Sequence, residues 1–155
     1  MDDYFKKAEG LLPLAGRIFL AALFLWSGYG KIGGWDNAAG YMAAMHMPLI
    51  PFFLGAALAL ELAGGLAVLF GFKTRLMAFL LALYLVPTTL IFHNFWSAPP
   101  DQHLMQLINF MKNGAIFGGL LMMARLGAGE FSIDNMLATR RTKSEEAAPS
   151  LKKAT

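Results

Sequence analysis

Four long apolar runs dominate this 155-residue chain and decide what it can fold into. Each run is close to the length of about 17–25 residues that a helix needs to cross the hydrocarbon core of a bilayer. Only 15% of the residues are charged, whereas soluble domains carry about 25%. The chain is therefore predicted to be an all-α integral membrane protein, a four-helix bundle with four transmembrane helices. The predicted spans are residues 11–30, 50–70, 76–92 and 107–124.

The connections between the runs refine this prediction. Only five residues, GFKTR, join the second and third spans, so these two helices must be antiparallel neighbours. Pro87 is expected to kink the third span, and the fourth span has an alternative start near His103. A cleaved signal peptide is the alternative for the first run. That run is long, no small-residue cleavage site follows it closely, and three further spans come after it, so we favour a membrane span.

The polar segments divide the chain into three parts. Residues 1–10 form a short cytoplasmic segment, residues 11–126 the four-helix membrane domain, and residues 127–155 a basic cytoplasmic tail. In the tail, FSIDNMLATRR is predicted to form a short amphipathic helix that lies on the membrane, with Ser132 as its N-cap. The remaining stretch, KSEEAAPSLKKAT, is predicted to be disordered. We interpret the basic residues of the tail as topology and lipid-contact signals.

Lysine and arginine are distributed unequally between the two sides of the predicted membrane domain. The two connections on one side hold a single basic residue, Lys31, and the other basic residues outside the spans lie on the opposite side. The positive-inside rule then places both termini in the cytoplasm. For a bacterial chain, this predicts a multi-pass protein of the inner (cell) membrane, with the other two connections in the periplasm. Those connections hold all three histidines, His46, His93 and His103.

The composition limits the chemistry that is open to this chain. It has no cysteine, which excludes disulfides, thiolate metal sites, iron–sulfur ligation and thiol redox steps on its own side chains. His93 and His103 flank the second outer connection, but no two histidines have the i, i+4 spacing of a helical metal site. A metal or haem site on these histidines is the weaker alternative. We therefore predict no metal site and assign His93 and His103 to proton handling.

Polar and charged side chains inside the predicted spans form a candidate site. At 1.5 Å per residue, Glu61 lies about 16 Å from the outer end of its span, and Arg17 lies about 20 Å from the outer end of the first. Lys112 lies about 8 to 13 Å from the outer end, depending on where the fourth span begins. These depths predict that Glu61 pairs with Arg17, Lys112 or both. The predicted intramembrane polar cluster comprises Arg17, Lys31, Glu61, Asn109, Lys112 and Asn113.

The predicted polar cluster has two interpretations. An isolated charge near the bilayer centre costs about 2.5–3.5 kcal/mol on insertion scales, so one anion, its cations and two amides could satisfy one another and lock the helices together. Alternatively, the cluster lines a polar cavity for an anion, a proton path or the head group of a quinone. Ionisable residues inside membranes are functional by default, so we favour the second interpretation. Asn109, Lys112 and Asn113 are expected to share one helix face, given their i, i+3, i+4 spacing.

Three stretches carry a resemblance to a known family: GRIFLAALFLWSGYGKI, ELAGGLAVLFGFKTRLMAFLL and MKNGAIFGGLLMM. Together they resemble the DoxX family of small four-helix membrane proteins, over residues 12–126. The residues that carry the resemblance are Arg17, Gly28, Lys31, Glu61, Gly64, Gly65, Gly71, Arg75, Lys112, Asn113 and Gly119. The resemblance implies a fold of four membrane helices. It also implies links to a thiosulfate:quinone oxidoreductase, to terminal quinol oxidase complexes and to membrane complexes that handle thiol and oxidative stress.

The residues and the resemblance together predict a membrane subunit of a quinone- or sulfur-linked redox complex, which binds a quinone or a small anion at the polar cluster. Trp26, Tyr29 and Tyr84 are expected to hold the quinone ring. The chain has no self-contained catalytic motif, so it is left open whether the chain is itself an enzyme. We expect no cofactor on this chain other than a bound quinone, and a redox cofactor in a partner. The alternative is a non-enzymatic transporter, scaffold or biogenesis factor.

The expected partners are the lipid bilayer, a redox protein or further copies of the chain, and the small ligand. No nucleic-acid binding is expected, because the basic residues lie at membrane edges and in the tail. Two small-xxx-small motifs in the fourth span allow helix backbones to approach closely. We attribute them to packing within the bundle, with dimerisation as the weaker alternative. They are formed by Gly114 with Gly118 and by Ala115 with Gly119.

Reporter fusions test the predicted topology. A reporter fused after Gly71 is expected in the cytoplasm and one fused after Pro99 in the periplasm, because basic connections are retained on the cytoplasmic side. Alkaline phosphatase activity measures periplasmic location, and the fluorescence of a cytoplasm-restricted reporter measures the opposite. Two fusions that report the same compartment would contradict the arrangement of four spans.

Overall fold

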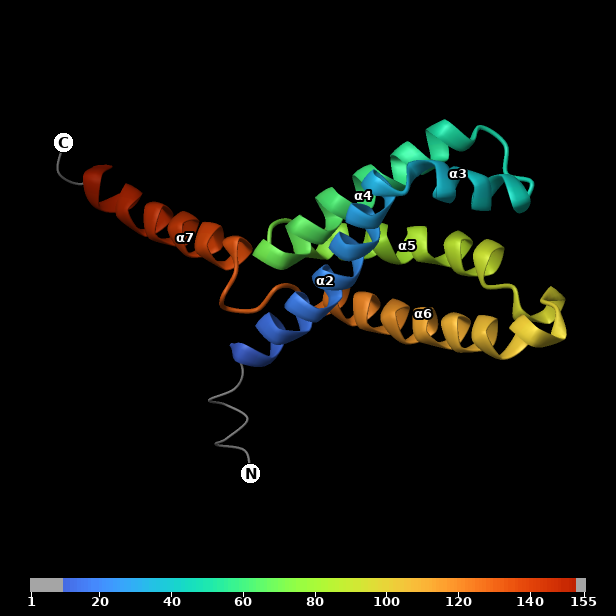
Figure 1. Ribbon diagram of the computed structural model, residues 1–155. Coiled ribbons are helices and arrows are strands. Elements are labelled where there is room, and N and C mark those ends of the chain that lie inside the picture. The colour runs from blue at the N-terminus through green and yellow to red at the C-terminus, as the bar shows by residue number, and fades with distance from the viewer. Residues whose placement is uncertain (1–9, 153–155) are drawn as a thin grey trace, which may run out of the picture.

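The computed structural model describes residues 10–152, with side chains as far as Glu145, and has four long helices in its membrane domain. These helices pack together and alternate in direction (Figure 1), and each is long and apolar enough to cross a membrane. No strand occurs among residues 10–152, so the predicted all-α membrane bundle is confirmed. Residues 1–9 of the predicted N-terminal segment lie outside the described part. The four helices are α2 (Leu11–Gly33), α4 (Ile50–Phe70), α5 (Thr74–Phe92) and α6 (Pro100–Leu126).

The membrane helices begin and end close to the predicted residues, except that α6 begins well before the predicted start at Leu107. α4 has the predicted bounds, and α5 starts slightly earlier than expected, at Thr74. α6 starts at Pro100, ahead of the alternative start near His103. Proline suits the first position of a helix, and Asp101 in the first turn stabilises the positive end of the helix dipole. α5 continues as a helix through Pro87.

Two short helices lie in the connections on one side, and the sequence pattern predicts neither. α3 (Trp35–Ala44) follows α2 after Gly34 and lies beside the first part of α4 (Figure 1). η1 (Phe95–Ser97) precedes α6, and its Phe95 ring packs edge to face on Phe110 with centroids 5.3 Å apart. We call the end of the bundle with α3 and η1 the cavity end, and the end where α4 turns into α5 the turn end.

The buried core lies in the half of the bundle nearer the turn end. Lipid tails are as apolar as the side chains themselves, so close packing rather than exclusion of water drives helix association in a membrane. All four membrane helices contribute to this packing, and the cavity end is packed less completely. The core consists of Ala21, Phe24, Val68, Ala78, Leu81, Ala82, Leu85, Leu120 and Met123.

A further helix, α7 (Ile133–Lys152), follows the membrane domain. The prediction of disorder from Lys143 is wrong as far as the end of α7. Arg141 and Glu145 form an exposed i, i+4 salt bridge of 3.0 Å, and such pairs favour a helix by about 0.3–0.5 kcal/mol. In Figure 1, α7 leads away from the turn end. The helix is longer than the short one expected, and its position on the membrane surface stays a prediction.

Hydrogen bonds tie the beginning of α7 to the turn end. Ser132 is the N-cap as predicted, since its hydroxyl accepts the Asn135 backbone N–H at 3.2 Å. The Asp134 carboxylate accepts the backbone N–H groups of Lys73 and Thr74 at 2.7 and 2.9 Å. These N–H groups belong to the N-cap and the first residue of α5, where a negative charge also stabilises the helix dipole. A residue far along the chain thus caps a membrane helix.

Gly71 ends α4 in a left-handed backbone conformation, with φ at 69°, which glycine adopts without strain. The Phe72 N–H donates to the Ala67 carbonyl at 2.8 Å, as in a Schellman C-cap. Arg17 occupies the space beside Gly71 and donates from Nη2 to the Phe131 carbonyl. These contacts join α2, the turn after α4 and the start of the tail. The junction is buried, because Arg17 is only 1% exposed.

Gly71→Ala tests this junction. The substitution is expected to lower the melting temperature, because a Cβ here would collide with Arg17 and Ser132, and because the left-handed conformation costs alanine about 1–2 kcal/mol. Gly30→Ala is the matched control, since its Cβ would meet nothing within 4 Å and alanine is the better helix former. Thermal unfolding followed by circular dichroism in detergent measures both variants. A melting temperature of Gly71→Ala equal to that of the wild type would contradict the tight packing.

Candidate functional site

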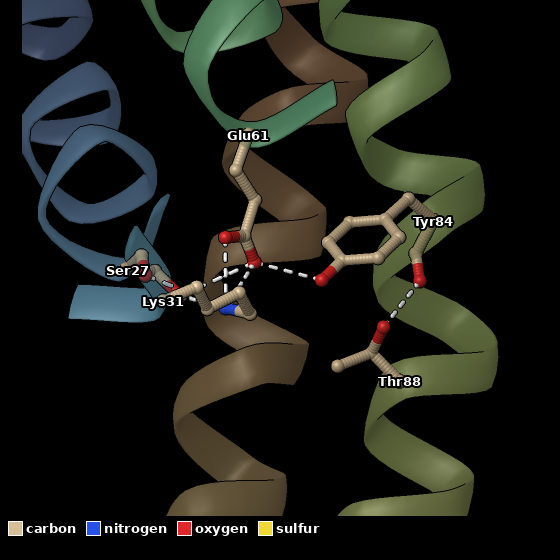
Figure 2. Close-up of polar contacts among 5 residues, drawn as sticks. All are labelled: Ser27, Lys31, Glu61, Tyr84 and Thr88. Carbon is tan, nitrogen blue, oxygen red and sulfur yellow. Dashed lines mark hydrogen bonds and ion pairs between the residues drawn. The ribbon is translucent and has the colours of Figure 1, made fainter. Parts of the chain in front are cut away.

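Glu61, the one acidic residue of α4, lies at the meeting point of three helices (Figure 2). It is 3% exposed. Lys31 of α2 donates from Nζ to Glu61 Oε1 and Oε2 at 2.9 and 2.8 Å. The hydroxyl groups of Tyr84 and Ser27 donate to Oε1 at 2.7 and 3.2 Å. We call these four residues the carboxylate cluster; within it, one cation and two hydroxyl groups satisfy the buried anion.

The register between α2 and α4 decides which cation meets Glu61. Gly28 packs against α4, where a Cβ would lie 2.8 Å from Leu62 Cδ2 and 3.4 Å from the Cβ of Glu61. Lys31 follows Gly28 by about one helical turn and reaches the carboxylate, whereas Arg17 precedes Gly28 by about 16 Å along the axis. The predicted pair of Glu61 and Arg17 is therefore wrong. The depth comparison assumed helices that end level, and α2 is shifted along α4.

The polar residues of α6 lie apart from the carboxylate cluster. Lys112 is exposed and donates from Nζ to Asn109 Oδ1 at 2.9 Å, so its predicted pairing with Glu61 is also wrong. Asn113 is buried and donates from Nδ2 to Thr89 Oγ1 at 3.1 Å, which joins α6 to α5. Adjacent residues of an α-helix point about 100° apart. The three α6 residues therefore do not share one face as expected: Lys112 points outward, and Asn113 points into the bundle.

A cavity of about 760 Å³ opens beside the carboxylate cluster and extends toward the cavity end. Small-molecule sites typically have about 300–1,000 Å³ and a mostly apolar wall with a few convergent polar groups. Here Lys31, Glu61 and Tyr84 supply the polar part. The wall comes from α2, α3, α4 and α5 and includes Met42, Leu54, Ala57, Leu60, Pro87 and Phe92.

Two of the three histidines line this cavity. His46 and His93 do so at the cavity end, and His93 Nδ1 lies 3.0 Å from Gln106 Oε1 in a hydrogen bond. His103 is exposed, packs edge to face on Phe95 with centroids 5.8 Å apart, and does not line the cavity. In the described part of the chain, no group of three histidine or acidic side chains is placed to hold a metal ion. Of the two histidines assigned to proton handling, only His93 is near the site.

Sequence reasoning missed two polar residues of the site. Ser27 precedes Lys31 by one turn of α2, and its hydroxyl accepts the Lys31 ammonium at 2.8 Å. The i, i+4 spacing of Ser27 and Lys31 inside an apolar run places the two side chains on one helix face, and this pattern could have identified Ser27 from the sequence. Thr88 lines the cavity one turn after Tyr84 and donates to the Tyr84 carbonyl at 2.9 Å (Figure 2).

The aromatic residues expected around a quinone ring are only partly at the site. Tyr84 lines the cavity with its hydroxyl on the carboxylate. Trp26 and Tyr29 are 78% and 68% exposed and lie outside the cavity wall. The expectation for these two residues is corrected, since both side chains are exposed on the outside of the bundle.

Comparisons with known proteins agree with this architecture. The DoxX family model matches residues 12–94, and the model of the SURF4 family matches residues 56–139. The chain is 39% identical over 132 residues to inner membrane protein YqjF of Escherichia coli (strain K12), covering 85% of this chain and 96% of that protein. It is 32% identical over 130 residues to inner membrane protein YphA of the same organism, covering 84% and 93%.

A more distant likeness reaches eukaryotic proteins. The ER-derived vesicles protein ERV29 of Saccharomyces cerevisiae is 27% identical over 128 residues, which are 83% of this chain and 34% of that protein. No solved structure matches. The family match, the coverage of the bacterial relatives and the four membrane helices agree, and the chain therefore belongs to the DoxX family of membrane proteins.

Proposed function

We propose that the protein binds the head group of a quinone at the carboxylate cluster, as the membrane subunit of a quinone-linked redox complex. The cavity is the observation that carries this proposal, because its mostly apolar wall meets Lys31, Glu61 and Tyr84 at one place. A quinone has an apolar ring and two carbonyl oxygens, so it requires hydrogen-bond donors inside an apolar site. The Lys31 ammonium and the Tyr84 hydroxyl are donors of this kind, and a quinone carbonyl would take over one of the hydrogen bonds that they donate to Glu61.

The charge of the cluster favours a neutral ligand over a small anion. Lys31 and Glu61 form a one-to-one salt bridge of 2.8 Å, so the site has no surplus cation. Arg17 and Lys112, the two cations predicted to pair with Glu61, lie elsewhere. An incoming sulfur oxyanion would place a second negative charge beside the Glu61 carboxylate, with only one lysine to balance both, whereas a quinone is uncharged. We therefore favour the quinone-linked alternative over the sulfur-linked one.

The reduction of a quinone to a quinol takes up two electrons and two protons. In our proposal the Glu61 carboxylate exchanges protons at the head group, and His93 passes them between the cavity and the aqueous phase. The electrons come from a redox cofactor in a partner protein, since this chain has no cysteine to hold an iron–sulfur cluster. With both termini in the cytoplasm, the cavity would open toward the periplasm of the inner membrane.

A second candidate is a non-enzymatic role as a membrane carrier, scaffold or biogenesis factor. The match of residues 56–139 to the SURF4 family and the likeness to ERV29 favour this candidate. The same cavity would then hold a lipophilic molecule that undergoes no redox change. Transfer of such a molecule by the pure protein between vesicles, without any binding of quinone, would support the second candidate over the first.

Quinone binding is expected to depend on the cavity. Ala57→Trp should abolish binding of decylubiquinone, because an indole ring would fill the space that Ala57 leaves in the wall. Tyr84→Phe should weaken binding by about two- to ten-fold, the loss expected for one hydrogen bond. Equilibrium titration of the purified protein in lipid nanodiscs measures both constants. Lys112→Met, which changes a lysine outside the cavity wall, should bind as the wild type does. Unchanged affinity in Ala57→Trp would refute the site.

Stability measurements separate a ligand site from a purely structural clasp. Lys31→Met leaves Glu61 buried without its cation. In the wild type, the Lys31 side chain is 22% exposed and the Glu61 side chain 4% exposed. We expect a loss of about 3–5 kcal/mol in unfolding free energy. Adding Glu61→Gln should recover most of that loss, because no charge then remains unpaired. Denaturant unfolding in mixed micelles, followed by tryptophan fluorescence, measures both.

The double variant also reports on function. If the carboxylate cluster binds the ligand, Lys31→Met combined with Glu61→Gln should restore stability without restoring quinone affinity. Recovery of both properties would show that the pair only holds helices together. A Lys31→Met variant as stable as the wild type would show that the salt bridge does not contribute to folding.

A further inference from the structure

One face of α6 is left uncovered by the other described residues, 10–152. Its opposite face packs on α5, and α2 meets α6 near Gly119, where a Cβ would lie 3.7 Å from Leu20 Cδ1. Beyond this contact, α2 and α6 diverge toward the cavity end (Figure 1). The uncovered face carries six exposed residues at alternating spacings of four and three, namely Leu104, Ile108, Met111, Ala115, Gly118 and Met122.

This spacing is the one that two packed helices require. A seven-residue repeat keeps a single seam of side chains facing a neighbouring helix at a crossing angle of about 20°, the usual geometry in membrane bundles. Small residues at the middle of the seam, here Ala115 and Gly118, allow a neighbouring backbone to approach closely. A Cβ at Gly118 would meet nothing within 4 Å. No described element of this chain therefore uses the close approach that the seam permits.

Lys112 flanks the seam and adds a charge to it. It lies about 18 Å from the first residue of α6 and about 21 Å from the last, so it is near the middle of the helix. Its Nζ donates to Asn109 Oδ1. The salt bridges of the described side chains are Lys31–Glu61 and Arg141–Glu145, so Lys112 has no carboxylate partner among them. An ammonium facing lipid at this depth is unfavourable, and its four-carbon stem covers only part of the way to the interface.

We propose that this seam binds a transmembrane helix of a different protein, which carries an aspartate or glutamate opposite Lys112. Charge complementarity selects this occupant. A second copy of α6 offers only Asp101, in its first turn, and would place another lysine near the first. Glu61 is already bonded to Lys31 and buried. The seam shares no residue with the cavity wall, so the proposal stands or falls independently of the quinone.

The absence of cysteine from the chain permits a site-specific test on the full-length protein in native membranes. Ala115→Cys places one thiol in the seam, and a thiol-linked benzophenone then cross-links whatever packs there. Leu66→Cys, at an exposed position of α4 that is 46% accessible, is the control. We expect a light-dependent adduct with a second protein from position 115 and none from position 66. The cross-linked peptide, identified by mass spectrometry, should belong to a membrane helix with an acidic residue.

The charge of Lys112 provides the decisive comparison. Lys112→Met in the Ala115→Cys chain should reduce the adduct by about three- to fifteen-fold, the range of polar contacts between membrane helices. Exchanging the charges, with Lys112→Glu here and lysine at the partner's acidic position, should restore it. Circular dichroism should show equal helix content for all variants, because Lys112 is exposed. An adduct between two copies of this chain, an adduct that is insensitive to Lys112→Met, or no adduct would each overturn the proposal.

Discussion

The buried carboxylate of Glu61 is the constraint on which the arrangement of the helices depends. An anion inside a membrane domain needs a cation and hydrogen-bond donors, and α4 itself carries neither. Lys31 and Ser27 come from α2 and Tyr84 comes from α5, so three helices must keep one register. Gly28 sets this register, because it lets α2 pack directly against α4 beside the carboxylate. The salt bridge is thus a consequence of backbone packing as well as a contribution to it.

The two halves of the bundle differ in how completely they are packed. At the turn end, the apolar core and the contacts of Arg17, Gly71 and Asp134 hold the helices and the start of the tail together. At the cavity end, α3, the end of α2, the first part of α4 and the end of α5 leave a space of about 760 Å³. The carboxylate cluster lies where the two halves meet. A polar group at such a boundary is held by packed side chains on one side and stays accessible on the other, as a binding site requires.

The sequence predicted the spans well and the contacts between them poorly, for one physical reason. Bilayer thickness fixes the length of an apolar run, so a run can be read without knowledge of its neighbours. Contacts depend on the offset between helices, and a shift of α2 along α4 replaces Arg17 by Lys31 as the partner of Glu61. The orientation of α6 depends likewise on its packing against α5. Its apolar residues surround most of the helix, so periodicity alone did not show that Lys112 faces outward.

The order of the cluster residues along the chain matters for how the protein is made. Membrane helices enter the bilayer one after another during synthesis, and Lys31 in α2 precedes Glu61 in α4. The cation is therefore already in place when the carboxylate leaves the ribosome and reaches the membrane. Tyr84 arrives with α5 and completes a pair that exists before it. A nascent chain that ends after α4 thus already contains both partners of the salt bridge between Lys31 and Glu61. The carboxylate can therefore be neutralised before the later helices are inserted.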